Sequence, residues 1–319
     1  MMKEPDVLLV GVGNMGKEYY KVLRDLPCSV TVVGNSASGT EQFAADTKGT
    51  AYMGGVTGNR EVINNSGITY AIIATPIHTL KAVALDCLRL GIKKILIEKP
   101  AGKNPNEVAE LAKLEKEYGA NIFVACNRRF FASVDTLLKL IDGQHETISS
   151  VRFEFTEWLS RTYKVHGNDR IHNNIFFSNS IHVIDLAFFF AGMPEKISSF
   201  TAEQNDWTDD KLRYAGAGIT KNNVLFSYFA DWKSPGRWAV EVMTNDTRYY
   251  LKPMETLQIQ KKESVKVDTV EMKDTFDQRY KPGMFAMVDA FLNGGEKKKR
   301  LLTLREHNDM MWVYKKMMK

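Results

Sequence analysis

Short, mostly apolar segments alternate with longer amphipathic segments through the first part of the chain. The short segments are residues 6–10, 29–33, 69–74, 94–97 and 121–125. The segments 79–90 and 106–118 have helical patterns that stop before Gly91 and Gly119. Apolar strands that alternate with helices are typical of a parallel sheet covered on both faces. We therefore predict an α/β domain with a doubly wound parallel sheet over residues 1–125.

The pattern changes after about residue 126. Residues 151–158 alternate apolar and polar side chains, which predicts a half-exposed strand, and the apolar segment 178–191 predicts a helix. Further strands are expected at 224–229, 238–243 and 247–251, and further helices at 284–292 and 303–317. This mixture predicts an α+β domain with a mainly antiparallel open sheet over residues 126–319. No flexible linker precedes it, so we expect a tight hinge between the two domains.

A glycine turn follows the first predicted strand. The apolar run that ends at Val10 continues into Gly11-Val12-Gly13-Asn14-Met15-Gly16, and a helical pattern comes next. In such a turn the first glycine allows the bend, the second lets the backbone approach a pyrophosphate, and the third lets the helix pack on the strand. The helix N-terminus then offers free N–H groups to phosphate. This strand–turn–helix context predicts a dinucleotide-binding Rossmann domain.

The choice of dinucleotide depends on the turn after the second predicted strand. In NAD-binding domains an acidic residue there binds the ribose 2′-hydroxyl. Here the strand ends in Gly34-Asn35-Ser36, without a carboxylate that would repel a 2′-phosphate. Asn35 and Ser36 favour NADP because both side chains can donate hydrogen bonds to that phosphate. No arginine stands nearby, however, so a plain polar turn and NAD both stay open.

Composition narrows the class of protein. The 319 residues are 44% hydrophobic and 25% charged, with a net charge of +5, which suits a chain that buries a sizeable core. The one dense basic cluster, residues 297–300, has no interleaved aromatic residues, so we expect no nucleic-acid partner. No apolar run reaches the roughly 18 residues that span a bilayer, and no signal peptide is visible. The three cysteines have no metal-binding spacing, so we expect reduced thiols, a cytoplasmic protein, no metal site and no membrane partner.

Three motifs together resemble the glucose–fructose oxidoreductase/inositol dehydrogenase (Gfo/Idh/MocA) family. They are the glycine turn 11–16, Glu98-Lys99-Pro100 after the strand at 94–97, and His182-Val183-Ile184-Asp185 on the helix at 178–191. The segments 75–78 and 127–130 are also similar to the family's forms at those places. The resemblance covers nearly the whole chain and implies an NAD(P)-dependent oxidoreductase.

The resemblance implies roles for individual residues. Lys99 contacts the reacting hydroxyl and the cofactor in such enzymes, and its ammonium stabilises a developing alkoxide. His182 is the implied general base, whereas Asp185 is more often structural, and Pro100 is expected to fix its turn through a cis peptide. The expected cofactor-binding residues are Gly11, Gly13, Asn14, Met15, Gly16, Asn35, Ser36, Thr75, Pro76, His78, Glu98, Lys99 and Asn127. The expected substrate-binding residues are Lys99, Arg128, Asn173, Ser178, Asn179 and His182.

One position departs from the family pattern. An aspartate often stands four residues before the histidine, and this chain has Ser178 there. A serine can bind a sugar hydroxyl but lacks the charge that pairs with the lysine and polarises the histidine. Residues 161–174 carry a polar, partly basic set of side chains that would suit an anionic substrate. A solvated loop explains the same residues.

The sequence thus predicts hydride transfer between nicotinamide and a secondary alcohol or ketone of a sugar or sugar derivative, with acidic and nucleotide-linked sugars among the options. A reductase of a non-sugar substrate and a non-catalytic dinucleotide-sensing regulator are the alternatives on this fold. Lys99 argues against the regulator. A homo-oligomer, dimer or tetramer, is expected through the second sheet. The apolar side chains that suggest it are Leu225, Phe226, Tyr228, Phe229, Trp232 and Trp238.

Overall fold

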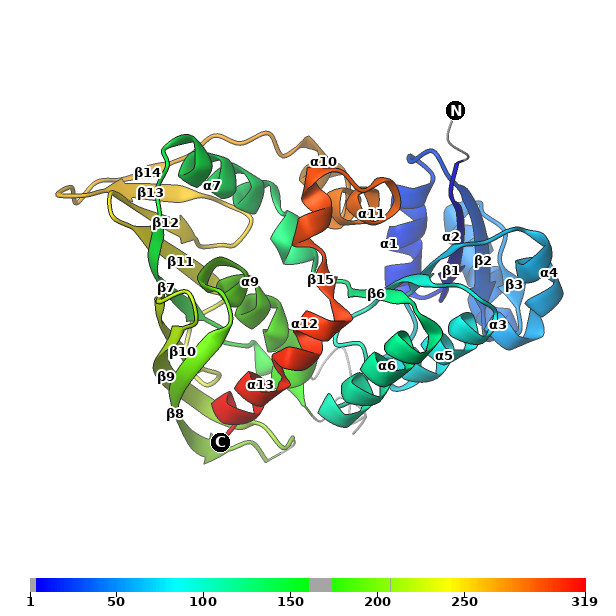
Figure 1. The fold of residues 1–319 in the computed structure, drawn as a ribbon, viewed down its shortest axis with the longest axis horizontal. Helices are drawn as coiled ribbons and strands as arrows, with labels where there is room; N and C mark the ends of the chain where they lie inside the picture. The colour runs from blue at the N-terminus through cyan, green and yellow to red at the C-terminus, as the bar shows by residue number, and fades with distance from the viewer. Residues whose placement is uncertain (1–3, 161–173, 207) are drawn as a thin grey trace. The chain divides into compact units, whose positions relative to one another are not determined.

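The structure is a computed structural model that describes residues 4–160, 174–206 and 208–319 (Figure 1). The chain divides into two compact units. The first unit comprises residues 1–127 and 276–309, and the second comprises residues 128–275 and 310–319. Each unit contains one large sheet, as the two predicted domains require.

The first unit is built on a seven-stranded sheet in the order β15-β6-β5-β4-β1-β2-β3. Its strands are β1 (Asp6–Val10), β2 (Ser29–Gly34), β3 (Tyr52–Met53), β4 (Tyr70–Ile73), β5 (Lys94–Ile97), β6 (Asn121–Val124) and β15 (Leu302–Thr303). All pairs are parallel except that of β15 with β6. The strand order reverses beside β1, which lies between β2 and β4. The predicted doubly wound parallel sheet is therefore confirmed.

Helices complete the first unit. They are α1 (Asn14–Leu23), α2 (Ala37–Thr47), α3 (Gly55–Gly58), α4 (Arg60–Asn65), α5 (Leu80–Arg89), α6 (Pro105–Tyr118), α10 (Thr275–Arg279), α11 (Met284–Asn293) and α12 (Leu304–Asp309), with short 3-10 turns η1 (Ile77–Thr79) and η5 (Glu296–Arg300). A third 3-10 turn, η2 (Asn127–Phe130), lies at the passage into the second unit. Their apolar faces bury side chains such as Leu88 and Leu111 against a sheet core that includes Leu8 and Ile72. Figure 1 shows α5 beside α6 and α11 beside α1, contacts that the two pairs of helices make within this unit.

The single boundary predicted at residues 125 and 126 differs from the division in the structure. Residues 276–309 belong to the first unit, although they were assigned to the second domain. The reason is packing over a long sequence separation: Leu302 pairs with Val124 at the sheet edge, and α12 packs on α6. The sequence pattern of 284–292 and 303–317 predicts helices but not which sheet they cover. The predicted helix at 303–317 is also interrupted, because α12 ends at Asp309 and α13 begins at Met311.

The second unit is built on an eight-stranded sheet in the order β14-β13-β12-β11-β7-β10-β9-β8. Its strands are β7 (Ile148–Glu154), β8 (Pro194–Gln204), β9 (Lys211–Thr220), β10 (Leu225–Asp231), β11 (Ala239–Thr244), β12 (Thr247–Leu251), β13 (Gln258–Lys261) and β14 (Val267–Thr269). Only β7 and β10 pair in parallel, so the predicted mainly antiparallel sheet is confirmed. The described helices of this unit are α7 (Ala132–Gly143), α9 (Ile181–Ala191) and α13 (Met311–Met317). A π-helical turn, η4 (Phe176–Ser180), leads into α9, where the sequence had predicted one regular helix.

The side chains of β10 alternate between the core and the open face of this sheet. Phe226 and Tyr228 are buried in the unit's own core, and so are Trp232 and Trp238 beyond the strand. These four residues were predicted to form a subunit contact, and that prediction is wrong for them because the chain covers them itself. Leu225 and Phe229 do lie exposed on the sheet. Among the described residues, no helix is long and apolar enough to cross a membrane.

Candidate functional site

The glycine turn between β1 and α1 is shaped by close backbone approaches. Gly11 has a φ of +115°, and a Cβ placed on it would lie 2.4 Å from the carbonyl oxygen of Ala74. A Cβ on Gly16 would lie 2.0 Å from the carbonyl oxygen of Gly11, so only glycine lets α1 start this close to the turn. A Cβ on Gly13, in contrast, would meet nothing within 4 Å. The turn therefore has two structural glycines and one that faces open space.

The open space beside Gly13 adjoins the first turn of α1. Gly13 is the extended N-cap residue of this helix and provides no side-chain cap, and Asn14 and Met15 are the first helical residues. Backbone N–H groups at a helix N-terminus attract anions. Gly13, Asn14 and Met15, three of the expected cofactor-binding residues, form this helix start, which is suited to an anion such as a pyrophosphate.

The turn after β2 contains Asn35 and Ser36. Ser36 is the N-cap of α2, and its Oγ accepts a hydrogen bond from the Gly39 backbone N–H at 3.2 Å. This capping bond occupies one acceptor site of the hydroxyl, which can still donate its proton to a ligand. The Asn35 side chain is exposed at the end of the strand. The turn offers hydrogen-bond donors without a carboxylate.

Thr75 follows β4, and its side-chain hydroxyl is a candidate for contact with a ligand. Its Oγ1 is buried and has no hydrogen-bond partner among the residues that the structure describes. A buried hydroxyl without a partner is costly, so such atoms often contact a bound molecule. Pro76 and His78 continue from Thr75 into the 3-10 turn η1. A dinucleotide fits this edge of the sheet on two observations, namely the space beside Gly13 and this hydroxyl.

The loop after β5 contains Lys99, and hydrogen bonds of the residues on either side fix its backbone. Glu98, before it, accepts a hydrogen bond from the buried Tyr19 hydroxyl of α1 at 2.7 Å, and burial is the main reason why the pKa of that phenol is raised. The Lys99–Pro100 peptide is cis, as the resemblance implied. The Pro100 carbonyl oxygen accepts a hydrogen bond from Nε2 of the buried His307 at 3.1 Å. Lys99 itself is half-buried.

Asn127 follows β6, and its amide Nδ2 donates to the carbonyl oxygen of Pro282 at 2.8 Å. It therefore ties β6 to the segment before α11 within the first unit. Gly11, Asn35, Thr75, Glu98 and Asn127 thus follow the carboxyl ends of β1, β2, β4, β5 and β6, which share one edge of the sheet.

In the second unit, His182 lies near the start of α9 and is only 4% exposed. Its Nε2 lies 3.2 Å from Nη1 of Arg128. A guanidinium can only donate, so this contact is a hydrogen bond in the tautomer whose Nε2 carries no proton. The indole of Trp238 packs beside both groups, 5.9 Å from the imidazole centroid and 5.3 Å from the guanidinium carbon of Arg128.

The segment before His182 is held by acceptors that the sequence analysis did not consider. The carboxylate of Asp210 accepts from the backbone N–H groups of Ile175 and Phe176 at 2.7 and 3.2 Å. Burial raises the pKa of Asp210 to about 6, although these bonds oppose the rise. Ser178 and Asn179 are half-buried within η4. Asn173, a predicted substrate residue, lies outside the described residues, as do the basic side chains at 161–172.

Asp185 pairs with Arg129 rather than with His182. The two oxygens of the carboxylate accept from Nε and Nη2 of Arg129 at 2.9 and 2.6 Å, and both side chains are buried. Such a bidentate pair fixes the orientation of α9 against the segment that carries Arg128. The structural role that the resemblance implied for Asp185 agrees with this geometry.

Sequence reasoning missed Glu157 and Arg237. The buried carboxylate of Glu157 contacts Asn179, Ser180 and Trp238, and Arg237 pairs with it at 3.3 Å. Glu157 is the last residue but one of the alternating segment 151–158, but nothing in the pattern shows that residues some 20 and 80 positions later converge on it. Among the described residues, no group of three His, Cys, Asp or Glu side chains could hold a metal ion.

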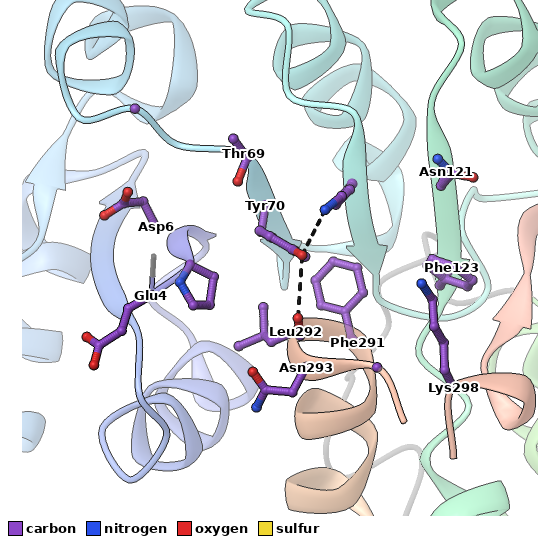
Figure 2. A pocket seen from close by; sticks show the side chains of 14 residues that line it. Glu4, Asp6, Thr69, Tyr70, Asn121, Phe123, Phe291, Leu292, Asn293 and Lys298 are labelled. Atoms are coloured by element: carbon purple, nitrogen blue, oxygen red, sulfur yellow. Dashed lines mark hydrogen bonds between the residues drawn. The ribbon is translucent and has the colours of Figure 1, made fainter. Parts of the chain in front are cut away.

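A pocket of about 670 Å³ lies at the opposite edge of the first sheet (Figure 2). Its lining includes Asp6, Tyr70, Lys94 and Asn121, the first residues of β1, β4, β5 and β6. The Tyr70 hydroxyl accepts from Lys94 Nζ at 2.8 Å and faces the Leu292 carbonyl oxygen at 3.4 Å. Because ligands of doubly wound sheets bind at the carboxyl ends, this pocket is separate from the expected nucleotide site.

Comparisons with known proteins agree with this geometry. Residues 6–126 match the model of a family described as an oxidoreductase family with an NAD-binding Rossmann fold. The chain is 28% identical over 218 residues to trans-1,2-dihydrobenzene-1,2-diol dehydrogenase of Mus musculus, a match that covers 65% of this chain and 64% of that protein. It is 22% identical over 200 residues to scyllo-inositol 2-dehydrogenase (NADP(+)) of Bacillus subtilis, covering 62% of this chain and 55% of that protein.

A solved structure extends the likeness to the whole fold. The UDP-N-acetylglucosamine 3-dehydrogenase of Acidithiobacillus ferrooxidans superimposes with a TM-score of 0.75 at 16% identity, covering 98% of this chain and 96% of that one. At this identity the likeness shows a shared fold. The family match therefore shows an NAD-binding Rossmann domain of the Gfo/Idh/MocA oxidoreductase type at residues 6–126, and the curated relatives and the solved structure are dehydrogenases to which the rest of the chain is also similar.

Proposed function

We propose that this protein is an NAD(P)-dependent dehydrogenase or reductase that acts on a secondary alcohol or ketone of a sugar or sugar derivative. The observation that carries the proposal is the edge of the first sheet, where the space beside Gly13, the N-terminus of α1 and the unpartnered Thr75 hydroxyl fit a dinucleotide. The other expected cofactor-binding residues flank the same edge. A bound nicotinamide accepts or supplies the hydride.

Lys99 and His182 are the proposed catalytic residues. In the oxidation, the alcohol carbon loses hydride and its hydroxyl loses a proton, so a carbonyl forms. We assign the proton to Nε2 of His182, where the hydroxyl takes the place of the Arg128 donor. The ammonium of Lys99 donates to the oxygen as negative charge develops on it. Reduction runs through the same groups in reverse.

The substrate class follows from relatives and from the residues near His182. The relatives named above act on a cyclic diol and on an inositol, both of which carry neighbouring hydroxyl groups on a ring. Ser178 and Asn179 are suited to hold such hydroxyls. Arg128 supports the acidic option, because a guanidinium matches the geometry of a carboxylate or phosphate. A substrate without ring hydroxyls, the alternative, would need none of these contacts.

The proposal is tested by mixing the protein with NADP⁺ or NAD⁺ and a panel of alcohols while following absorbance of the reduced nicotinamide. The panel contains scyllo-inositol, trans-1,2-dihydrobenzene-1,2-diol, and neutral and acidic sugars. Turnover of a ring alcohol with either cofactor is the expected result. Nucleotide binding without turnover of any compound would favour the sensing regulator, and absence of nucleotide binding would contradict both readings.

NADP is the proposed preference, and Asn35→Asp is expected to reverse it. A carboxylate at this position repels the 2′-phosphate and binds the ribose 2′-hydroxyl of NADH instead. We expect the Kd for NADPH to rise at least about tenfold, roughly the effect of 1.4 kcal/mol, and the Kd for NADH to fall. Fluorescence titration measures both constants. Asn64→Asp, the same change at an exposed position of α4, should leave them unchanged. Tighter NADH binding by the unmodified protein would contradict the preference.

A homo-oligomer through the open face of the second sheet is also proposed. Phe200 and Phe229 are 72% and 49% exposed, and both stand in register with Ala215 of β9, so they lie on one row of the sheet. We expect sedimentation equilibrium to give a multiple of 36.2 kDa and Phe229→Glu to reduce the mass. Val265→Glu, in the turn between β13 and β14, is the control. A monomeric unmodified protein would contradict the proposal.

The three thiols form no disulfide, which supports a reducing, cytoplasmic compartment.

A further inference from the structure

A buried carboxylate lies at the centre of the polar cluster in the second unit. Glu157 is 2% exposed and stands three residues beyond β7. Four side-chain donors surround it. Oε1 accepts from Ser180 Oγ at 2.7 Å and Trp238 Nε1 at 3.2 Å, and Oε2 accepts from Asn179 Nδ2 at 3.0 Å and Arg237 Nη1 at 3.3 Å.

A carboxylate this deeply buried is expensive to keep, and burial raises the pKa of Glu157 against the lowering effects of the Ser180 hydroxyl and the Arg237 charge. A buried ion pair contributes little net stability compared with apolar packing of the same volume. The presence of a carboxylate at position 157 is therefore better explained by the positions in which it holds its four hydrogen-bond donors than by a gain in stability.

Those donors come from both sides of His182. Asn179 and Ser180 are the last residues of η4 and directly precede α9, so they set where this helix starts. On the other side, Trp238 packs against the His182 imidazole, and its ring also lies beside the guanidinium of Arg128 that donates to Nε2. One carboxylate therefore fixes the helix start that carries His182 and the indole that flanks it.

Arg237 adds a brace on the outer side of the cluster. Its guanidinium carbon lies 4.2 Å from the Trp238 ring centroid and 4.7 Å from that of Trp158. The indole Nε1 of Trp158 donates to the carbonyl oxygen of Gly236 at 2.8 Å, which ties this stack to the segment before β11. Glu157 therefore contacts the Trp238 indole in two ways, directly as the acceptor of its Nε1–H group and indirectly through Arg237, which pairs with Glu157 and stacks on the indole ring.

We propose that Glu157 is a positioning residue for His182. It orients the histidine from a different element of the chain, in place of the aspartate that the family pattern often has at the position of Ser178. This inference rests on the proposed function, because it assigns the role relative to a general base. Glu157 acts through Asn179, Ser180 and Trp238 rather than by touching the substrate.

Glu157→Gln tests the proposal with almost no change in volume. An amide has one acceptor oxygen, so it can serve either the Ser180–Trp238 side or the Asn179–Arg237 side, and its NH2 group meets donors on the other. Small displacements of a catalytic group cost up to about 100-fold in rate. We expect kcat to fall roughly 10- to 100-fold while the Kd for the reduced nucleotide stays the same, since the first unit is untouched. Trp238→Phe, which loses one bond and keeps most of the ring, should give a smaller loss.

Glu146→Gln is the matched control in the same unit. The side chain of Glu146 is 3% exposed, and it accepts from Thr244, Thr247 and Tyr249 at 2.9, 2.7 and 2.7 Å, away from His182. Both variants replace a little-exposed carboxylate that accepts several side-chain hydrogen bonds by an amide with one acceptor oxygen, so the melting temperature should fall in both. If Glu146→Gln loses kcat as much as Glu157→Gln does, the effect is general destabilisation and the proposal is overturned.

A second readout separates this inference from the proposed function. Long-range ¹H–¹⁵N NMR on the whole protein reports which ring nitrogen of His182 carries the proton. We expect the Nδ1–H form in the unmodified protein, and a mixture of tautomers in Glu157→Gln because Arg128 loses its fixed place on Trp238. If Glu157→Gln changes the His182 tautomer but the unmodified protein has no dehydrogenase activity, the proposed function is contradicted and the positioning role of Glu157 is supported. Unchanged His182 signals together with unchanged kcat would overturn the positioning role alone.

Discussion

Replacing Lys99 by methionine is expected to lower kcat by roughly 100- to 1,000-fold, the range found when a donor to a developing oxyanion is removed. Methionine keeps the unbranched stem and removes the ammonium. The backbone should stay in place, because Glu98 is held by Tyr19 and the Pro100 carbonyl by His307. The nucleotide Kd should therefore change far less than kcat. Steady-state kinetics on the best substrate of the panel, with fluorescence titration of NADPH, measure the two effects separately.

Lys103→Met is the matched control for this experiment. Lys103 lies in the same loop, 55% exposed, and its Nζ is 3.3 Å from Oε1 of Glu107 at the start of α6. An exposed ion pair of this kind is worth at most about 1 kcal/mol, so its loss should leave kcat unchanged. If Lys99→Met retained kcat within tenfold of the unmodified enzyme, Lys99 would not be the group that stabilises the alkoxide.

Alanine at Gly13 and alanine at Gly16 are expected to damage different properties. A methyl group on Gly16 collides with the Gly11 carbonyl oxygen, so α1 or the turn must shift, and we expect the free energy of unfolding to fall by about 2 kcal/mol or more. A methyl group on Gly13 meets no protein atom within 4 Å, and its φ of −75° suits alanine. Its cost as an N-cap residue is below about 1 kcal/mol. The methyl group would instead occupy the space that a pyrophosphate needs.

We therefore expect Gly13→Ala to fold like the unmodified protein and bind NADPH at least about tenfold more weakly, a loss of 1.4 kcal/mol or more. Urea unfolding followed by circular dichroism measures the first property, and fluorescence titration measures the second. Normal NADPH affinity in a folded Gly13→Ala variant would show that the phosphates do not bind at this turn.

The sequence predicted the first sheet well because its signals are local. Each strand is apolar throughout, helices stop at glycines such as Gly91 and Gly119, and the glycine turn follows directly on β1. The carboxyl ends of parallel strands share one edge, so residues that directly follow these strands, such as Asn35, Thr75 and Glu98, lie at the same edge of the sheet. The assignment of residues 276–309 was wrong because it depends on the pairing of β15 with β6, about 180 positions apart.

The site in the second unit was only half predictable. His182 and Arg128 were named from motifs, and the structure brings them within hydrogen-bond distance. Glu157 and Trp238 left no comparable signal. An acidic residue at a strand end and a tryptophan among apolar residues are common, and their meeting is decided by how β7, η4 and the start of β11 converge. Trp238 was assigned to a subunit surface because an aromatic residue in a strand pattern does not reveal which face it occupies.

The way the chain passes between its units also bears on how the protein is made. The first unit closes only after residue 309, because β15 and α12 come from the end of the chain, whereas 128–275 lie in the second unit. On the ribosome, residues 1–127 therefore emerge without the strand that covers β6 and without the helix that packs on α1. Nearly the whole chain must be synthesised before this unit is finished. Premature termination near residue 275 would yield an incomplete nucleotide-binding unit, and a chaperone has a long interval in which to meet its uncovered apolar edge.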